Sequence, residues 1–234
     1  MIFFAARPLP ETIDGVNLRV STRAKNLGLR FDPRMADVVL IWPQNLKSSE
    51  KNLKRAHDFI ARHRGWIKKH RNAIPAQHFA AGAQIPFQGR MLTVVHQAGR
   101  GVTKIDGDIL RVYGDTRHLA RRIKDFLKQQ AYDAALPLIR EKEKILKVSP
   151  AKLRMADPKA RWGSCSSEAK LMLSWRLIMA PPAVLDYVVA HEVAHRLQMN
   201  HGRKFWALCL SLCEDGAKSR RWLKQNGAGL LAWR

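Results

Sequence analysis

Two histidines and one glutamate in the stretch Ala190-His191-Glu192-Val193-Ala194-His195 have the types and spacing needed for metal chemistry. Residues four apart on a helix lie about 40° apart around its axis, so both imidazoles can reach one metal ion from the same face. This spacing fits zinc. Glu192 is better placed to hold and deprotonate a water molecule on the metal than to bind the metal itself. The stretch therefore predicts a zinc site on His191 and His195, with Glu192 as the catalytic base.

A third histidine, His201, extends the pattern to H-E-x-x-H-x-x-Q-x-x-H. It stands where zinc peptidases with a long motif keep their third ligand, but Gln198 replaces the glycine that turns the chain of those enzymes back towards the metal. The helix can instead stop at Asn200, which tolerates a left-handed conformation, with Gly202 just beyond. We expect His201 to be the third ligand, which leaves a fourth position for water. Glu214 is the competing candidate.

The helix that carries the motif should be buried. From Pro181 to Leu197 the chain reads PPAVLDYVVAHEVAHRL, with prolines at the start and apolar residues on nearly every side afterwards. A glutamate and two histidines in such a helix would cost several kcal/mol unless they were paired or bound to a metal. The alternative to a metal site is a cluster of hydrogen-bonded histidines.

The composition is that of a globular protein. The 234 residues suit one large domain or two small lobes, and 46% hydrophobic content is enough for a core. The three cysteines are too few for a disulfide framework. We interpret Cys209 and Cys213 as small core residues rather than metal ligands. Cys165 is disfavoured as a nucleophile, because the histidines that could act as its base are already assigned as metal ligands.

Neither a membrane span nor a targeting segment is expected. No segment reaches the apolar length that spans a bilayer, and Met1–Ala6 is too short for the core of a signal peptide. We therefore expect a cytoplasmic protein with no membrane partner.

The formal net charge of +23, from 42 basic and 19 acidic residues, is the other prominent property of the chain. Such an excess attracts polyanions, so nucleic acid, nucleotides and acidic surfaces are candidate partners. The alternative is a solvated basic face that only keeps the protein soluble.

The first half of the chain should alternate strands and long basic helices. Of three runs near the start, two alternate like half-buried antiparallel strands and the third is apolar enough to be central. One helix should run from a cap at Ser48 or Ser49 to about Arg71, and a second should begin after Asp115 and kink or end at Pro137. Their outward faces are basic at Lys51–Lys69 and Arg117–Lys128. The expected strands are Val16–Val20, Leu27–Phe31 and Val38–Trp42, followed by a β-hairpin region over Gln84–Tyr113.

The second half should be compact. The run Arg140–Lys147 looks like a solvated helix end with Ile145 and Leu146 turned inward. The small residues of Arg161–Ser167 suit a tight backbone path or the approach of a ligand. The other expected elements are a strand at Lys152–Met155, a strand at Leu171–Ile178, the motif helix, a packing helix that opens at Phe205, and a closing segment at Arg220–Gln225.

Five motifs of the second half act together as a signature. They are Arg161-Trp162-Gly163-Ser164-Cys165-Ser166, Leu173-Ser174-Trp175-Arg176-Leu177, Asp186-Tyr187-Val188-Val189-Ala190-His191-Glu192, Asn200-His201 and Phe205-Trp206. This combination resembles the YgjP-like family of metal-dependent hydrolases, which is similar to the SprT-like and WLM-type zincins, small cytoplasmic zinc peptidases of which some are tied to DNA. Carried over position by position, the resemblance implies one zinc ion on His191, His195 and His201, with Glu192 as the catalytic base.

The favoured function is zinc-dependent hydrolysis of a peptide bond in a peptide or protein substrate. A zinc site with a carboxylate base can also attack a phosphoanhydride when suitable cations are near, and some members of the family are labelled UTP pyrophosphatases. The alternatives are therefore a nucleotide pyrophosphohydrolase of the UTP type and a nucleic-acid-associated zinc protein. Arg161, Arg176 and Tyr187 are the candidates for contacts with the substrate or with a developing oxyanion.

These elements predict an α+β, zincin-like fold with antiparallel-rich sheet regions and an active-site HExxH helix. Residues 1–147 would form a basic strand-and-helix half, and residues 148–234 would form the zincin-like catalytic half, either as two lobes or within one continuous domain.

Overall fold

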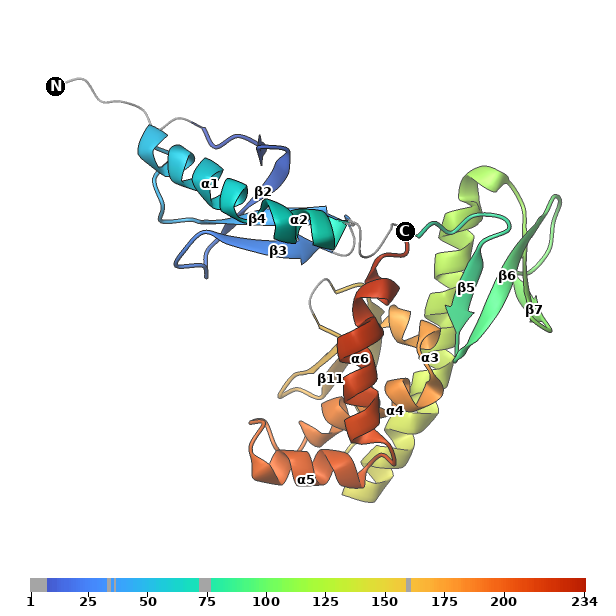
Figure 1. The fold of residues 1–234 in the computed structure, drawn as a ribbon. Helices are drawn as coiled ribbons and strands as arrows, with labels where there is room; N and C mark the ends of the chain where they lie inside the picture. The colour runs from blue at the N-terminus through green and yellow to red at the C-terminus, as the bar shows by residue number, and fades with distance from the viewer. Residues whose placement is uncertain (1–7, 33–34, 36, 72–76, 159–160) are drawn as a thin grey trace. The chain divides into compact units, whose positions relative to one another are not determined.

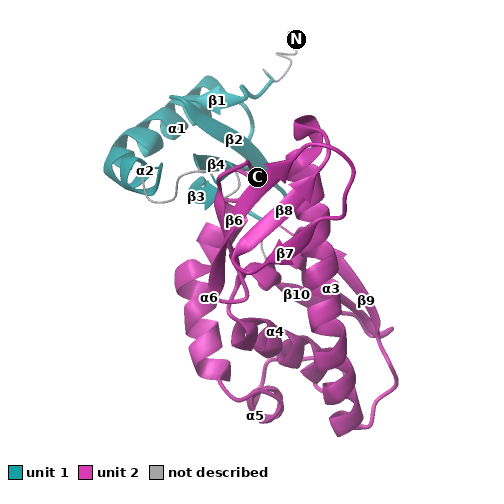
Figure 2. Cartoon of the chain, turned by 90° about the vertical axis from the view of Figure 1, so that its right-hand side faces the viewer, with its two compact units in different colours: residues 1–77 teal, residues 78–234 magenta. Residues whose placement is uncertain are grey.

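The structure is a computed structural model that describes residues 8–32, 35, 37–71, 77–158 and 161–234. The chain divides into two compact units, residues 1–77 and residues 78–234 (Figure 2). This division differs from the expected one after Lys147, because the second long basic helix packs on elements of the carboxy-terminal half. The described residues form six α-helices and three small sheets, so the predicted α+β class is confirmed.

The first unit is a four-stranded sheet with helices packed against it. The central strand β4 pairs antiparallel with β3 and in parallel with β2. The antiparallel pairing expected for the first strand run is therefore found on only one side of β2, where it pairs with β1. Side chains of β4 share one hydrophobic core with Ala56, Ile60 and Ile67 of the helices. The strands, in the order β1-β2-β4-β3, are β1 (Thr12–Ile13), β2 (Val16–Ser21), β4 (Asp37–Pro43) and β3 (Gly28–Asp32).

The helix predicted between Ser49 and Arg71 is divided at His63 into α1 (Glu50–Arg62) and α2 (Arg64–Arg71). Ser49 caps α1 as expected, because its side chain accepts a hydrogen bond from the backbone N–H of Asn52. At the division, the backbone N–H of His63 donates to the carbonyl oxygen of Ile60, and Nδ1 of His63 lies 2.8 Å from the carbonyl oxygen of Phe59.

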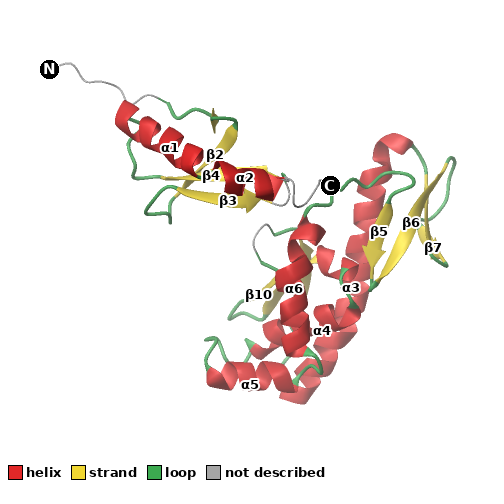
Figure 3. Ribbon diagram, in the orientation of Figure 1, coloured by secondary structure: helices red, strands yellow, loops and turns green. Residues whose placement is uncertain are grey.

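The second unit begins with a four-stranded sheet made of two hairpins. Gln88 and Gly89 both have positive φ, as a tight two-residue turn between β5 and β6 requires, and Gly107 has positive φ between β7 and β8. The predicted hairpin region is confirmed, and the two hairpins join through the parallel pair β6 and β8. Figure 3 shows this sheet beside one end of α3. The strands, in the order β5-β6-β8-β7, are β5 (Gln84–Phe87), β6 (Arg90–Gln97), β8 (Ile109–Tyr113) and β7 (Lys104–Asp106).

The helix α3 (Leu119–Leu146) follows a short 3-10 turn at Thr116–His118 and continues past Pro137. Proline removes one backbone hydrogen bond from a helix interior. Buried residues on both sides of it, Ala135 before and Ile139 after, hold the helix against its neighbours and offset that loss.

The remaining elements enclose the motif helix. The predicted strand Leu171–Ile178 ends at Ser174 and continues as a 3-10 turn at Trp175–Met179. Figure 1 shows α4 between α3 and α6, and each of these two helices packs against α4. No helix within the described ranges is both long and apolar enough to cross a membrane. The elements are β9 (Lys152–Ala156), β10 (Gly163–Cys165), β11 (Lys170–Ser174), α4 (Pro182–Ala194), α5 (Arg203–Ser211) and α6 (Gly216–Leu231), and the strand order is β10-β11-β9.

Candidate metal centre

The helix α4 carries the first part of the histidine motif and is buried along nearly its whole length, as its sequence predicts. Pro182 lies in its first turn, where a missing backbone N–H costs little. The helix ends at Ala194, and His195 follows as its cap with φ −63° and ψ −14°. His191 and His195 therefore remain one helical turn apart on the same side.

Three imidazoles converge at the end of α4. His191, His195 and His201 each offer one ring nitrogen, and the three atoms lie within 4.8 Å of one another. The Nε2 atoms of His191 and His201 are 3.0 Å apart. Two nitrogens on one tetrahedral zinc ion, at roughly 2.1 Å each, would lie about 3.4 Å apart. The donor set and its spacing therefore fit a metal ion.

The environment of His191 and His195 favours the neutral imidazole, which is the form that binds a metal. Burial lowers the pKa of His191 to about 4, with further lowering by His195, His201 and Arg220. Burial also lowers the pKa of His195.

The backbone after α4 turns without the glycine of the long motif. Neither Gln198 nor Asn200 has a positive φ, so the left-handed ending expected at Asn200 is absent. The carbonyl oxygen of Gln198 instead lies 3.1 Å from Nδ1 of His195. A carbonyl in this place fixes the ring so that Nε2 is left to face the other two histidines. Gln198 is therefore compatible with a three-histidine site.

Phe205 of α5 is the packing partner shared by all three imidazoles. It is fully buried, and its ring centre lies 4.9 Å from that of His191 and 4.6 Å from those of His195 and His201. The sequence predicted only that Phe205 belongs to a packing helix. Its contact with the histidines depends on the path of the chain between α4 and α5, which a local pattern does not reveal.

Glu192 lies beside the histidines and is only 6% exposed. Burial raises its pKa to about 7, and the positive charge of Arg161 acts in the opposite direction. The glycine of the Arg161–Ser167 loop makes room for this side chain: a Cβ atom at Gly163 would lie 2.5 Å from Oε1 of Glu192 and 2.6 Å from its Cγ. The tight backbone path predicted for this loop is the strand β10, which passes directly over Glu192.

Gly163→Ala should lower the free energy of unfolding by about 1–3 kcal/mol, because the added methyl group must displace Glu192 or β10. Urea denaturation measures this change. Gly229→Ala in α6 is the matched control, since a Cβ atom added there would meet nothing within 4 Å and alanine is favoured over glycine inside a helix. Equal stability changes in the two variants would contradict the steric role of Gly163.

A cavity of about 290 Å³ opens beside His191 and Glu192. Two of the residues predicted to contact substrate, Arg161 and Tyr187, line it. Burial raises the pKa of Tyr187, so its phenol remains a hydrogen-bond donor. Arg220 also lines the cavity, although the sequence placed it only in a closing segment. The full lining consists of Arg161, Trp162, Gly163, Tyr187, Val188, His191, Glu192, Arg220 and Leu223.

Arg176, the third residue predicted to contact substrate, is not among the residues that line this cavity. Its side chain is 4% exposed and forms an ion pair with Asp157 at 2.9 Å. It also donates hydrogen bonds to the carbonyl oxygens of Leu230 and Trp233, at 2.8 and 3.0 Å. Arg176 therefore holds the end of the chain in place, and it is left out of the site.

Cys165 shows no sign of activation at this centre. Cys165, at the end of β10, has its thiol pKa raised by burial and by Glu192. A catalytic cysteine requires the opposite shift. Cys209 is fully buried in the hydrophobic core, which agrees with its interpretation as a core residue.

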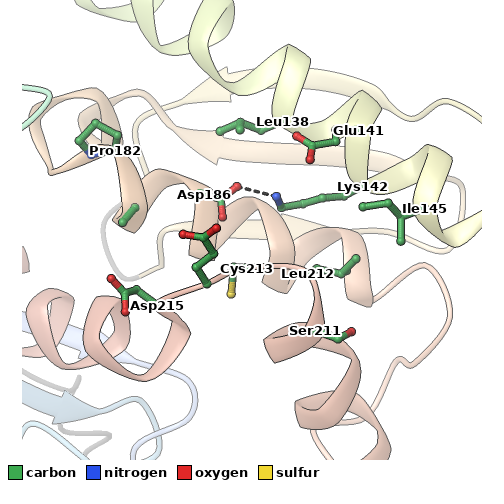
Figure 4. A pocket seen from close by; sticks show the side chains of 12 residues that line it. Leu138, Glu141, Lys142, Ile145, Pro182, Asp186, Ser211, Leu212, Cys213 and Asp215 are labelled. Atoms are coloured by element: carbon green, nitrogen blue, oxygen red, sulfur yellow. Dashed lines mark hydrogen bonds and ion pairs between the residues drawn. The ribbon is translucent and has the colours of Figure 1, made fainter.

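Glu214, the competing candidate ligand, lines a different cavity of about 530 Å³ (Figure 4). This cavity lies along α3 and the start of α4, and the ion pair between Lys142 and Asp186 crosses it. The expectation that Arg140–Lys147 is a solvated end with Ile145 and Leu146 inward is confirmed only for Leu146, which packs against the core. Lys142 and Glu143 are buried, and Ile145 is 58% exposed. Both charges are buried because each has partners, Asp186 for Lys142 and the backbone N–H of Ala151 for Glu143.

Asp186→Asn should lower the free energy of unfolding by about 2 kcal/mol, because the Lys142 ammonium would be left buried without its carboxylate. The measurement is urea denaturation at neutral pH. Asp125→Asn breaks the exposed 3.8 Å pair with Lys128 in the same way and should change stability by less than about 0.5 kcal/mol. If the two substitutions cost the same, the Lys142–Asp186 pair does not stabilise the packing of α3 on α4.

Comparison with known proteins agrees with this centre. A family model described as YgjP-like, metallopeptidase domain, matches residues 25–226. Searches of curated proteins and of solved structures find no significant match. The family match extends over most of both units and includes the three histidines, Glu192 and the residues around the cavity. The chain therefore belongs to the YgjP-like metallopeptidase family.

Proposed function

We propose that the chain is a zinc-dependent hydrolase of peptide bonds, with His191, His195 and His201 as the zinc ligands and Glu192 as the catalytic base. The observation that carries the proposal is the convergence of three imidazole nitrogens beside a buried carboxylate. Three protein ligands leave one coordination position open, which is typical of catalytic rather than structural zinc sites. The metallopeptidase description of the family supports a peptide as the substrate.

Zinc, when bound, acidifies a water molecule and polarises a carbonyl group. The carboxylate of Glu192 takes the proton of the attacking water and delivers it to the leaving nitrogen. Arg161 and Tyr187 line the same cavity as Glu192, so each can donate a hydrogen bond to the oxygen on which negative charge develops.

The position of β10 favours an extended substrate. It is an edge strand of its sheet, paired on one side with β11. Its first residue, Gly163, lies against Glu192. An extended peptide can add to such an edge through backbone hydrogen bonds, which would bring its scissile bond to the catalytic base.

The test compares substrates for the zinc-loaded chain. Unfolded protein and mixed peptides are offered in parallel with a panel of nucleoside triphosphates that includes UTP. We expect peptide cleavage that a chelator abolishes and added zinc restores. Hydrolysis of UTP without cleavage of any peptide would reject the peptidase assignment.

A nucleotide pyrophosphohydrolase is the second candidate, and the presence of Arg161 and Arg220 in one cavity with Glu192 favours it. In that case Arg161→Ala should abolish UTP turnover.

The basic helices of the first unit allow a separate test of the nucleic-acid hypothesis. Lys51, Lys54, Arg62 and Lys68 are all exposed on α1 and α2. Replacing the four with Gln should weaken binding of DNA or RNA and reduce its logarithmic salt slope by up to about 4, with zinc content unchanged. Gel-shift titrations at low and moderate salt measure both. Absence of binding at low salt, or binding that the four substitutions do not weaken, would reject this surface as a nucleic-acid site.

A further inference from the structure

The cavity beside the three histidines is lined by two arginines and several apolar residues, in addition to Tyr187, His191 and Glu192. Arg161 precedes β10 and Arg220 lies on α6, so the two come from different elements of the second unit. Trp162, Val188 and Leu223 supply apolar surface in the same cavity. Within the described part of the chain, neither guanidinium forms an ion pair with a carboxylate at hydrogen-bond distance. Both cations are therefore available to a ligand.

Arg220 is held close to the histidines by an aromatic ring. Its guanidinium carbon lies 4.7 Å from the ring centre of Trp206. The Trp206 ring centre is 5.8 Å from those of both His191 and His201. A guanidinium stacked on an aromatic ring still directs its N–H groups outward in its own plane, where they can bind a carboxylate with two hydrogen bonds.

A positive charge in this place opposes the binding of a metal cation. The repulsion is compensated when an anion lies between the arginine and the metal centre. The arrangement is thus suited to a substrate that brings its own negative charge.

We propose that this cavity binds a carboxylate of the substrate, with Arg220 as its partner, so that the enzyme selects acidic peptides. The inference rests on the peptidase function proposed above and names its substrate class. The methylene groups of a glutamate side chain would contact Trp162, Val188 and Leu223, and the cavity of about 290 Å³ holds one such side chain. The net charge of +23 attracts acidic substrates to the same molecule.

Cleavage-site profiling with a peptide library, followed by matched peptides with Glu, Gln or Lys at the selected position, tests the proposal. Wild-type kcat/KM should favour Glu over Gln roughly ten- to a hundredfold, and Arg220→Gln should remove this preference. Arg220→Glu should favour Lys instead. Arg221→Gln, an exposed neighbour on α6 outside the cavity, should keep the wild-type preference. Peptides with a free or amidated carboxy terminus show whether the carboxylate is that of a side chain or of the chain end.

An equal loss of kcat for all peptides in Arg220→Gln would overturn the proposal, because it would mean that Arg220 stabilises the developing oxyanion rather than a substrate carboxylate. Equal cleavage of Glu and Gln peptides by the wild type would overturn it as well.

Binding provides a readout that does not depend on turnover. Glu and Gln peptides are titrated into zinc-loaded Glu192→Gln and into Glu192→Gln/Arg220→Gln. Tighter binding of the Glu peptide by the first protein alone supports carboxylate recognition even if no peptide is cleaved, in which case only the peptidase assignment fails. Equal binding of both peptides, with UTP bound through Arg220 instead, rejects the carboxylate and favours the nucleotide.

Discussion

Glu192→Gln should lower kcat/KM for the cleaved substrate about a thousandfold while the metal content stays unchanged. Gln has nearly the same shape as Glu, so it can occupy the buried space under Gly163 without a new clash. The amide cannot accept the proton of the attacking water, and proton transfer by a positioned side chain is worth roughly a hundred- to ten-thousandfold in rate. The substitution therefore removes the chemistry of the residue and keeps its packing.

The measurement combines kcat/KM with zinc content by elemental analysis. Glu168→Gln is a matched control, since Glu168 is an exposed residue of the turn between β10 and β11. Its activity should equal that of the wild type. A Glu192→Gln protein that keeps its zinc and loses less than about tenfold in kcat/KM would show that Glu192 is not the general base.

Local patterns in the sequence were sufficient to place most elements. The apolar run Val38–Trp42 predicted a central strand, and β4 is central in its sheet. The direction in which β2 pairs with β4 could not be predicted in the same way, because an alternating strand pattern looks the same whether the neighbouring strand is parallel or antiparallel. The direction depends on the fact that β3 occupies the other side of β4.

The errors in the helices have a common cause, which is that tertiary contacts override local rules. Of the two outcomes expected at Pro137, a kink or an end of the helix, the end does not occur, because packing on both sides holds α3 together. The run Arg140–Lys147 was expected to be solvated, but its Lys142 and Glu143 are buried against partners that lie far along the chain or beyond the helix end. From the sequence alone, a charged residue is expected to be exposed unless its partner is known.

At the candidate centre, the residues that share one helix were predictable and those that meet from separate elements were not. His191 and His195 are four residues apart, so helical geometry brings them together. Arg220 reaches the cavity only because α6 packs beside α4. Gly163 had a local signal, the small residues of its loop, but its neighbour Glu192 became visible only in the folded chain.

His195→Ala should reduce the zinc content of the purified chain from about one ion per molecule to nearly none. The reason is the geometry of the three imidazoles: removal of one leaves two nitrogens and an open, partly hydrated site, which binds zinc much more weakly. His201→Ala should have the same effect. Elemental analysis after dialysis measures it for each variant.

Two controls separate ligand loss from general damage. His78→Ala removes an exposed histidine of the same unit and should leave zinc unchanged. Glu214→Gln should also leave it unchanged, because Glu214 lines the other cavity with Lys142 and Asp186. Loss of zinc in Glu214→Gln together with full occupancy in His201→Ala would transfer the third ligand to Glu214. Full occupancy in His195→Ala would reject the three-histidine centre, because the metal would then be bound by other groups.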